Sequence, residues 1–249
     1  MNPIELDILL PAFIAGLLVL ATHIPFGMRI LQRGVIFADL AVAQIAGLGV
    51  IIAGLLGLAE QSLPVQAIPF ASALCGAALL SWFEQHAAEV KEACIGLTFV
   101  LAASIGILLL SRDSHAGEQL QELLVGQILW VSNSQLIATA LLTVALLAMW
   151  YRFQARLNDF GFYALFALAV TASVQLVGIY LVFASLIVPA LATYRSAGHR
   201  MIHALTVGIC GYALGLLLSV WLDLPTGAAI VCTLALCGGI PMLLPRKPL

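Results

Sequence analysis

Long apolar runs, separated by short polar segments, extend along the chain from end to end. A transmembrane α-helix needs about 20 predominantly apolar residues to cross the roughly 30 Å hydrocarbon core of a bilayer. Runs of about this length predict helices at residues 6–27, 34–58, 65–83, 93–111, 135–151, 161–178, 179–194, 202–222 and 226–245. The expected fold is an all-α integral membrane protein, a polytopic bundle of eight or nine transmembrane helices that forms one transmembrane domain over residues 1–249.

The run at residues 179–194 is the weakest of the predicted spans. It follows Gly178 directly and contains Pro189, which lacks the N–H group that a helix interior requires. Residues 161–194 are therefore compatible with two full crossings, or with one crossing and a broken or re-entrant piece.

The composition supports a membrane location. Hydrophobic residues make up 63% of the chain and charged residues 9%, with a mean hydropathy of +1.11, whereas an ordinary soluble domain is about half apolar and a quarter charged. Ten bases against twelve acids give a net charge of -2, and the bases are scattered, which excludes nucleic-acid binding. The five cysteines lie in apolar runs without a CxxC pair, so we interpret them as small buried apolar residues.

The distribution of lysine and arginine predicts the orientation in the membrane. Cytoplasmic loops of membrane proteins are enriched in these residues. With the N-terminus outside and nine crossings, only Arg112 lies outside, and an odd number of crossings places the C-terminus in the cytoplasm. The bases expected in the cytoplasm are Arg29, Arg33, Lys91, Arg152, Arg156, Arg195, Arg200, Arg246 and Lys247.

Asp39 is the carboxylate that lies well inside an apolar run. A charge in such a place costs several kcal/mol unless it is paired or faces water. Helical geometry places Asp39 about 9 Å beyond Arg33, a depth that favours a cation contact along a translocation path. The alternative is a structural carboxylate that is salt-bridged to Arg33 or Arg29, or that caps the backbone at a helix bend. The residues alone leave both interpretations open.

Sequence motifs of hydrolytic chemistry are absent from the chain. Neither of its two lysines, Lys91 and Lys247, follows the glycine pattern of a P-loop, so this polypeptide is not itself the ATPase. GxSxG and HExxH are also absent, which disfavours an intramembrane enzyme. His199 and His203 have the i, i+4 spacing of metal ligands, but they flank Arg200 at a predicted helix start, where a solvated polar turn explains them.

Four segments of the chain carry recognisable motifs. The most distinctive is VQLVGIYLVFASLIVPALAT at residues 174–193. The others are FAD at 37–39, LLVGQIL at 123–129 and DLPTGA at 223–228. These segments resemble, in the same order, those of the zinc, manganese and iron ABC importer permeases. Since they span nearly the whole chain, it is identified as a member of this metal-type permease family.

The resemblance implies the architecture of the vitamin B12 and siderophore importer permeases, in the bacterial inner membrane. It implies import of a divalent transition metal as substrate, zinc first and then manganese or iron, with no cofactor bound by this chain. The implied partners are cytoplasmic ABC ATPase subunits that use ATP, an extracytoplasmic metal-binding protein, a second permease copy in a homodimer or heterodimer, and membrane lipid.

The resemblance also places a coupling region in this chain. By position, residues 194–200 belong to the cytoplasmic turn that docks in the ATPase cleft. The residues themselves agree with a turn, because a proline precedes it and a glycine lies between two bases. The residues assigned to coupling are Pro189, Arg195, Gly198, His199 and Arg200.

One departure from the family concerns the helix of Asp39. Family members commonly carry a histidine four residues after the aspartate, on the same helix face, where both side chains can meet one divalent ion. Here that position is Ala43. Either Asp39 acts with groups from a partner subunit, or the transient site is weaker or serves a different ion.

An ion-coupled secondary transporter is the alternative function. In that case Asp39 would couple an ion gradient directly. Such transporters carry inverted repeats with broken helices in both halves, whereas a Pro/Gly interruption stands out here only around residues 178–189.

Overall fold

The computed structural model describes residues 3–56, 63–110, 121, 123–153, 156–194 and 198–243. Every element with defined bounds in these residues is a helix, which confirms the all-α prediction. The elements are α1 (Pro3–Arg33), α2 (Ala38–Leu55), α3 (Leu63–His86), α4 (Lys91–Leu110), the 3-10 helix η1 (Ile128–Trp130), α6 (Asn133–Phe153), α7 (Asp159–Val177), α8 (Ile179–Ala192), α9 (Arg200–Trp221) and α10 (Thr226–Leu243).

Each predicted span corresponds to one α-helix. Among the described residues, seven helices are long and apolar enough to cross a membrane, namely α1, α2, α3, α4, α6, α7 and α9. The two others, α8 and the apolar part of α10 at Thr226–Gly239, are shorter. The weakest predicted span is thus a short helix of its own, separated from α7 by the single residue Gly178.

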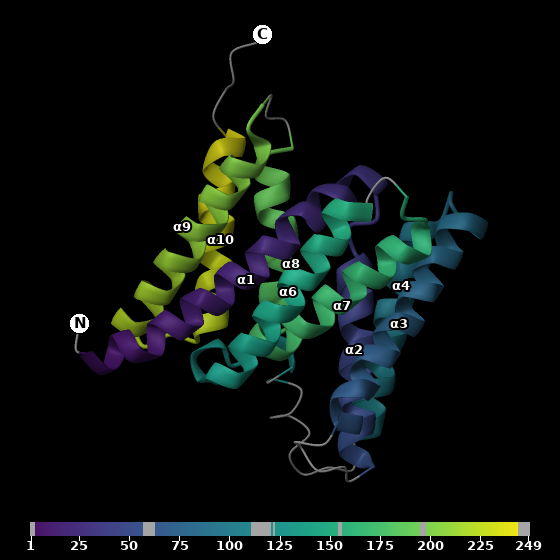
Figure 1. Cartoon of the computed structure of the whole chain (residues 1–249), viewed down its shortest axis with the longest axis horizontal. Coiled ribbons are helices and arrows are strands. Elements are labelled where there is room, and N and C mark those ends of the chain that lie inside the picture. The colour runs from purple at the N-terminus through teal and green to yellow at the C-terminus, as the bar shows by residue number, and fades with distance from the viewer. Residues whose placement is uncertain are drawn as a thin grey trace.

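Successive helices run in alternating directions, so every helix begins at one end of the bundle and finishes at the other (Figure 1). The residues at these two ends of the bundle differ in charge. In the figure, α9 and α10 lie on one side, α2, α3 and α4 lie on the other, and α1, α6, α7 and α8 lie between them. The basic end, at the top, is defined by Arg33, Lys91, Arg152 and Arg200 at or near helix ends. The glycine end, opposite, is defined by Gly126, Gly178 and Gly227.

An aromatic cluster joins α1, α6 and α7. The Phe26 ring packs edge-on against the rings of Trp150, Phe162 and Phe166, with centroid separations of 5.3, 6.1 and 6.1 Å. All four side chains are buried. Aromatic pairs contribute about 0.5–1.5 kcal/mol each beyond their burial, so the cluster holds the three helices together without polar contacts.

Large apolar side chains cover the outer surfaces of α4 and α6. Leu97 and Leu108 on α4 are 59% and 71% exposed, and Leu141 on α6 is 69% exposed. An apolar surface of this extent is unfavourable in water, whereas the hydrocarbon core of a bilayer accommodates it. The structure therefore agrees with the membrane location that the composition predicts.

The predicted start of the second span is wrong. Gly34 has a φ of +66°, a turn occupies residues 34–37, and α2 begins only at Ala38. Asp39 consequently lies in the first turn of α2, next to the helix end, and not about 9 Å along a helix that continues from Arg33, as the apolar run suggested.

The expectation of buried cysteines is also wrong. Cys75, Cys210 and Cys232 are exposed on helix surfaces, and Cys94 and Cys237 are partly exposed. All five are free thiols. In a membrane helix, a small apolar residue is as stable against lipid as against protein, so hydropathy does not separate these two environments.

Candidate functional site

Three of the motif segments meet at the glycine end. Gly126, in the LLVGQIL segment, lies against the backbone of Val177 and Gly178, which join α7 to α8. A Cβ atom at either glycine would collide with backbone atoms of the other segment. Gly227, in the DLPTGA segment, has the same relation to Val125, since its Cβ would come within 2.5 Å of the Val125 carbonyl oxygen.

Backbone conformation adds a second requirement for glycine at these contacts. Gly178 has φ 79° and ψ 164°, a region of backbone space that is essentially restricted to glycine. Gly126 has a φ of +70°. Segments that are about 50 residues apart in the chain thus pack backbone to backbone, and this contact positions α7, α8 and η1 relative to one another.

Asp39 is completely buried in the first turn of α2, with 1% of its surface exposed. Its Oδ1 accepts a hydrogen bond of 2.8 Å from the backbone N–H of Leu40. Its Oδ2 has no hydrogen-bond partner among the described residues. The salt bridge to Arg33 or Arg29, one of the interpretations that the sequence left open, is not formed among the described residues, where Arg33 pairs with Asp159 and Arg29 bonds to Gln32.

One carboxylate oxygen of Asp39 therefore acts at the helix terminus, where the helix dipole favours a negative charge. The other oxygen is left with an unused acceptor, an arrangement that costs free energy unless a cation or another donor uses it. A bond to the backbone and a cation contact, which the sequence presented as alternatives, are thus compatible in one side chain.

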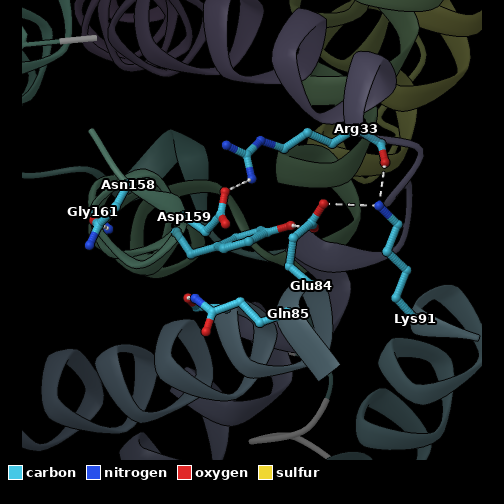
Figure 2. Close-up of polar contacts among 9 residues, drawn as sticks. Arg33, Glu84, Gln85, Lys91, Asn158, Asp159 and Gly161 are labelled. Carbon is cyan, nitrogen blue, oxygen red and sulfur yellow. Dashed lines mark hydrogen bonds and ion pairs between the residues drawn. The ribbon is translucent and has the colours of Figure 1, made fainter. Parts of the chain in front are cut away.

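A network of charged groups ties the basic end together (Figure 2). Arg33 Nη1 lies 2.8 Å from Asp159 Oδ1, and Lys91 Nζ lies 3.0 Å from Glu84 Oε1. Tyr163 donates its hydroxyl to Glu84 Oε2 at 2.7 Å, and Lys91 Nζ also donates to the Arg33 carbonyl oxygen at 2.8 Å. The network connects the ends of α1 and α3 with the beginnings of α4 and α7.

The environment of Arg33 strengthens this network. Its guanidinium carbon lies 4.4 Å from the centroid of the Phe162 ring, within the range of a cation–π contact. The Arg33 and Glu84 side chains are only 16% and 19% exposed, so solvent screens their interactions less than those of surface ion pairs. The sequence identified these bases only as markers of orientation, and its only signal for the network was the polar residues at the ends of the apolar runs.

Tyr163→Phe tests whether the network contributes to stability. The variant removes only the hydroxyl that Glu84 accepts, and bonds to a charged group contribute about 1.5–3 kcal/mol. We expect a loss of about 1–2 kcal/mol, measured as a lower thermal unfolding temperature of the purified protein. Tyr180→Phe, at a tyrosine that is 52% exposed, is the control. Equal unfolding temperatures for the two variants would contradict a stabilising role.

The residues assigned to coupling lie at the basic end. Thr193 follows the last residue of α8 as its C-cap and donates its hydroxyl to the Pro189 carbonyl oxygen at 3.0 Å. Arg200 Nε donates to the Thr193 carbonyl oxygen at 3.1 Å, which closes the connection from α8 to α9. Gly198 and His199 have φ values of 75° and 45°, as a tight turn before α9 requires. Arg195 lies outside the described residues.

Gly198 and His199 lie in the connection from α8 to α9 and Arg200 begins α9, whereas Pro189 lies inside α8, and Asp39 lies apart from them on α2. α8 continues three residues beyond Pro189 and ends at Ala192. Within the part of the chain that the structure describes, no three His, Cys, Asp or Glu side chains are grouped so that they could hold a metal ion.

Seven apolar helices of membrane-spanning length among the described residues, with charged groups gathered at one end of the bundle, define a multi-pass membrane protein. Residues 5–158 and 147–240 match the ABC 3 transport family, and the chain belongs to this family. It is therefore a membrane subunit of an ABC transporter, as the sequence motifs predicted.

Known proteins similar to this chain include membrane proteins of metal transport systems. The chain is 29% identical over 213 residues to the chelated iron transport system membrane protein YfeD of Yersinia pestis, covering 76% of this chain and 69% of that protein. It is 25% identical over 227 residues to the manganese transport system membrane protein MntC of Halalkalibacterium halodurans, covering 82% and 76%. The solved structure of PsaBC from Streptococcus pneumoniae in complex with a Fab has a chain of the same fold, with a TM-score of 0.74, 22% identity and coverage of 95% and 90%.

Proposed function

We propose that this chain is the permease subunit of an ATP-driven importer of divalent transition-metal ions. The observation that carries the proposal is the match to the ABC 3 transport family over nearly the whole chain, together with relatives that are named for manganese and chelated-iron transport. ATP hydrolysis belongs to separate ATPase subunits, and the metal ion is the substrate.

The proposed substrates are manganese or iron ahead of zinc, which the sequence had placed first. Relatives named for manganese and iron support this order. The residues on α2 support manganese independently, because Ala43 stands where an imidazole would suit zinc, while a lone carboxylate suits a harder ion such as Mn²⁺.

The proposed complex places the ATPase subunits at the basic end, against the connection from Thr193 to Arg200. A second permease copy completes the pathway, in a homodimer or a heterodimer, and an extracytoplasmic metal-binding protein docks at the glycine end. The basic end then faces the cytoplasm, as the positive-inside rule predicts for its arginines and lysines.

Accessibility labelling tests this orientation. In a protein whose native cysteines are replaced by alanine, a cysteine at Leu224 near the glycine end should react with an impermeant thiol reagent added to intact cells. A cysteine at His86, at the basic end, should react only after the membrane is opened. Labelling of the His86 position from outside would reverse the proposed orientation.

Metal uptake by the reconstituted complex tests the function. Vesicles that contain the permease, its ATPase and its binding protein should accumulate radiolabelled manganese or iron only with ATP. Charge reversal at Arg195 and Arg200 together should abolish ATP-driven uptake but leave the protein in the membrane, because a repelled coupling turn no longer transmits ATP hydrolysis. Matched reversal at Arg152 and Arg156, at the same end but outside the turn, should leave uptake largely intact.

Two outcomes would contradict the proposal. Uptake driven by an ion gradient without the ATPase would indicate a secondary transporter. Normal ATP-driven uptake by the variant with reversed charges at Arg195 and Arg200 would remove the turn from the coupling mechanism.

A further inference from the structure

An open groove lies on the bundle surface near the basic end. Its volume is about 430 Å³. The residues that line it come from α1, α6 and α9 and are Pro25, Met28, Arg29, Gln32, Trp150, Tyr151 and Met201. It is separate from the charged network of Figure 2, whose labelled side chains come from other helices or other positions on α1.

The groove combines one positive charge with neutral donors and apolar walls. Arg29 is exposed, and within the described residues its guanidinium donates a hydrogen bond of 3.3 Å to Gln32 Oε1. None of the described lining residues is acidic. Tyr151 adds a hydroxyl, while Met28, Met201, Pro25 and the largely buried Trp150 form apolar walls. This set fits an anionic group that is attached to a hydrocarbon chain.

The position of the groove along the helices places it at the depth of lipid headgroups. The apolar span of α1, Ile8–Arg33, has 26 residues and is about 39 Å long at 1.5 Å per residue, longer than the roughly 30 Å hydrocarbon core. Arg29 lies one turn before its end, Tyr151 lies two residues before the end of α6, and Met201 is the second residue of α9. Tryptophan and tyrosine are enriched at this depth in membrane proteins.

We propose that this groove binds the phosphate headgroup of an anionic phospholipid. The Arg29 guanidinium pairs with the phosphate. The Tyr151 hydroxyl and the side-chain amide of Gln32 form hydrogen bonds with the headgroup, and an acyl chain lies along Met28 and Met201. Basic sites between transmembrane helices are suited to anionic headgroups by charge complementarity. The proposal depends on the chain spanning a membrane and is independent of which ion it transports.

Native mass spectrometry of the full-length purified permease tests the proposal. The protein is titrated with phosphatidylglycerol or with phosphatidylcholine of the same acyl chains. We expect preferential binding of phosphatidylglycerol, and Arg29→Gln should weaken that binding roughly fivefold, as the loss of one basic residue near a charged membrane surface predicts. Arg156→Gln, at an exposed arginine of the same end outside the groove, should change nothing.

A second variant tests whether lipid binding depends on the space in the groove as well as on the charge of Arg29. Met201→Trp keeps Arg29 but fills the groove, so it should also weaken phosphatidylglycerol binding while size-exclusion profiles stay those of the wild type. Equal binding of the two lipids, or equal weakening by Arg29→Gln and Arg156→Gln, would overturn the proposal. Displacement of the lipid by equimolar inorganic phosphate would show a free-anion site instead. Loss of ATPase capture by Arg29→Gln with unchanged lipid binding would show a protein contact instead.

Discussion

Gly178→Ala should be the most destabilising of the single substitutions considered, with a loss of about 2–6 kcal/mol. A side chain at this position is penalised twice. The backbone conformation at φ 79° and ψ 164° costs about 1–3 kcal/mol for a residue other than glycine. The added Cβ also collides with the backbone of Val125 and Gly126, and overpacking of this kind costs about 1–3 kcal/mol more. Thermal unfolding of the purified protein, and its yield from membranes, measure the effect.

Two glycine controls separate the contributions to this loss. Gly34 also has a positive φ, but a Cβ there would meet nothing within 4 Å, so Gly34→Ala should lose only about 1–2 kcal/mol. Gly96 is helical and also open, so Gly96→Ala should be neutral or slightly stabilising. If Gly178→Ala unfolds at the same temperature as Gly34→Ala, the backbone contact between Gly178 and Gly126 does not hold the glycine end together.

Asp39→Asn should reduce metal uptake about tenfold or more while the amount of protein in the membrane stays normal. The amide oxygen can still accept the Leu40 N–H, so the bond to the backbone in the first turn of α2 is kept. The change falls on the buried Oδ2, which has no hydrogen-bond partner among the described residues and becomes an uncharged NH₂ group. Loss of a ligand or of its supporting group typically costs 10–100-fold in metal affinity or activity. Uptake of radiolabelled manganese, iron and zinc, normalised to membrane protein, measures the effect.

Ala43→His provides the complementary change. Ala43 lies one helical turn after Asp39 and is buried, so a histidine there would add an imidazole to the carboxylate on one helix face. We expect tighter metal binding and a shift toward zinc, because imidazole is the better zinc ligand. Normal uptake by Asp39→Asn, together with no metal-dependent effect of Ala43→His, would leave Asp39 with only its structural bond to the Leu40 N–H.

The helices were predictable because each is determined by a local feature of the sequence, a continuous apolar run. Apolar runs at 93–111 and 202–222 correspond to α4 and α9 within two residues at each end, since a helix is the only open structure that satisfies its own backbone in lipid. The beginning of α2 was predicted wrongly because the prediction relied on this local hydropathy alone. Val35, Ile36 and Phe37 continue the apolar run through a turn, and only Gly34 marked the break.

Contacts between distant segments were not predictable from one sequence. Arg33 and Asp159 are 126 residues apart in the chain, and nothing in local hydropathy links them. The family motifs at 123–129, 174–193 and 223–228 were visible as separate segments, but their meeting at Gly126, Gly178 and Gly227 depends on how the helices pack. Asp39 was found because a buried charge in an apolar run is costly, whereas its pairing with Leu40 depended on where the helix starts.

The shortness of α8 has a consequence for the distance that an ion must travel. Its 14 residues span about 21 Å at 1.5 Å per residue, roughly 9 Å less than the hydrocarbon core. The bond from Arg200 to Thr193 holds one end of α8 at the level of a charged residue, so the shortfall falls at Gly178. With that end at the bilayer interface, the junction of α7 and α8 lies below the opposite membrane surface, and α7, whose 19 residues span about 28 Å, must reach it at a tilt. An ion delivered into this recess would have only about two thirds of the membrane's hydrocarbon thickness left to cross.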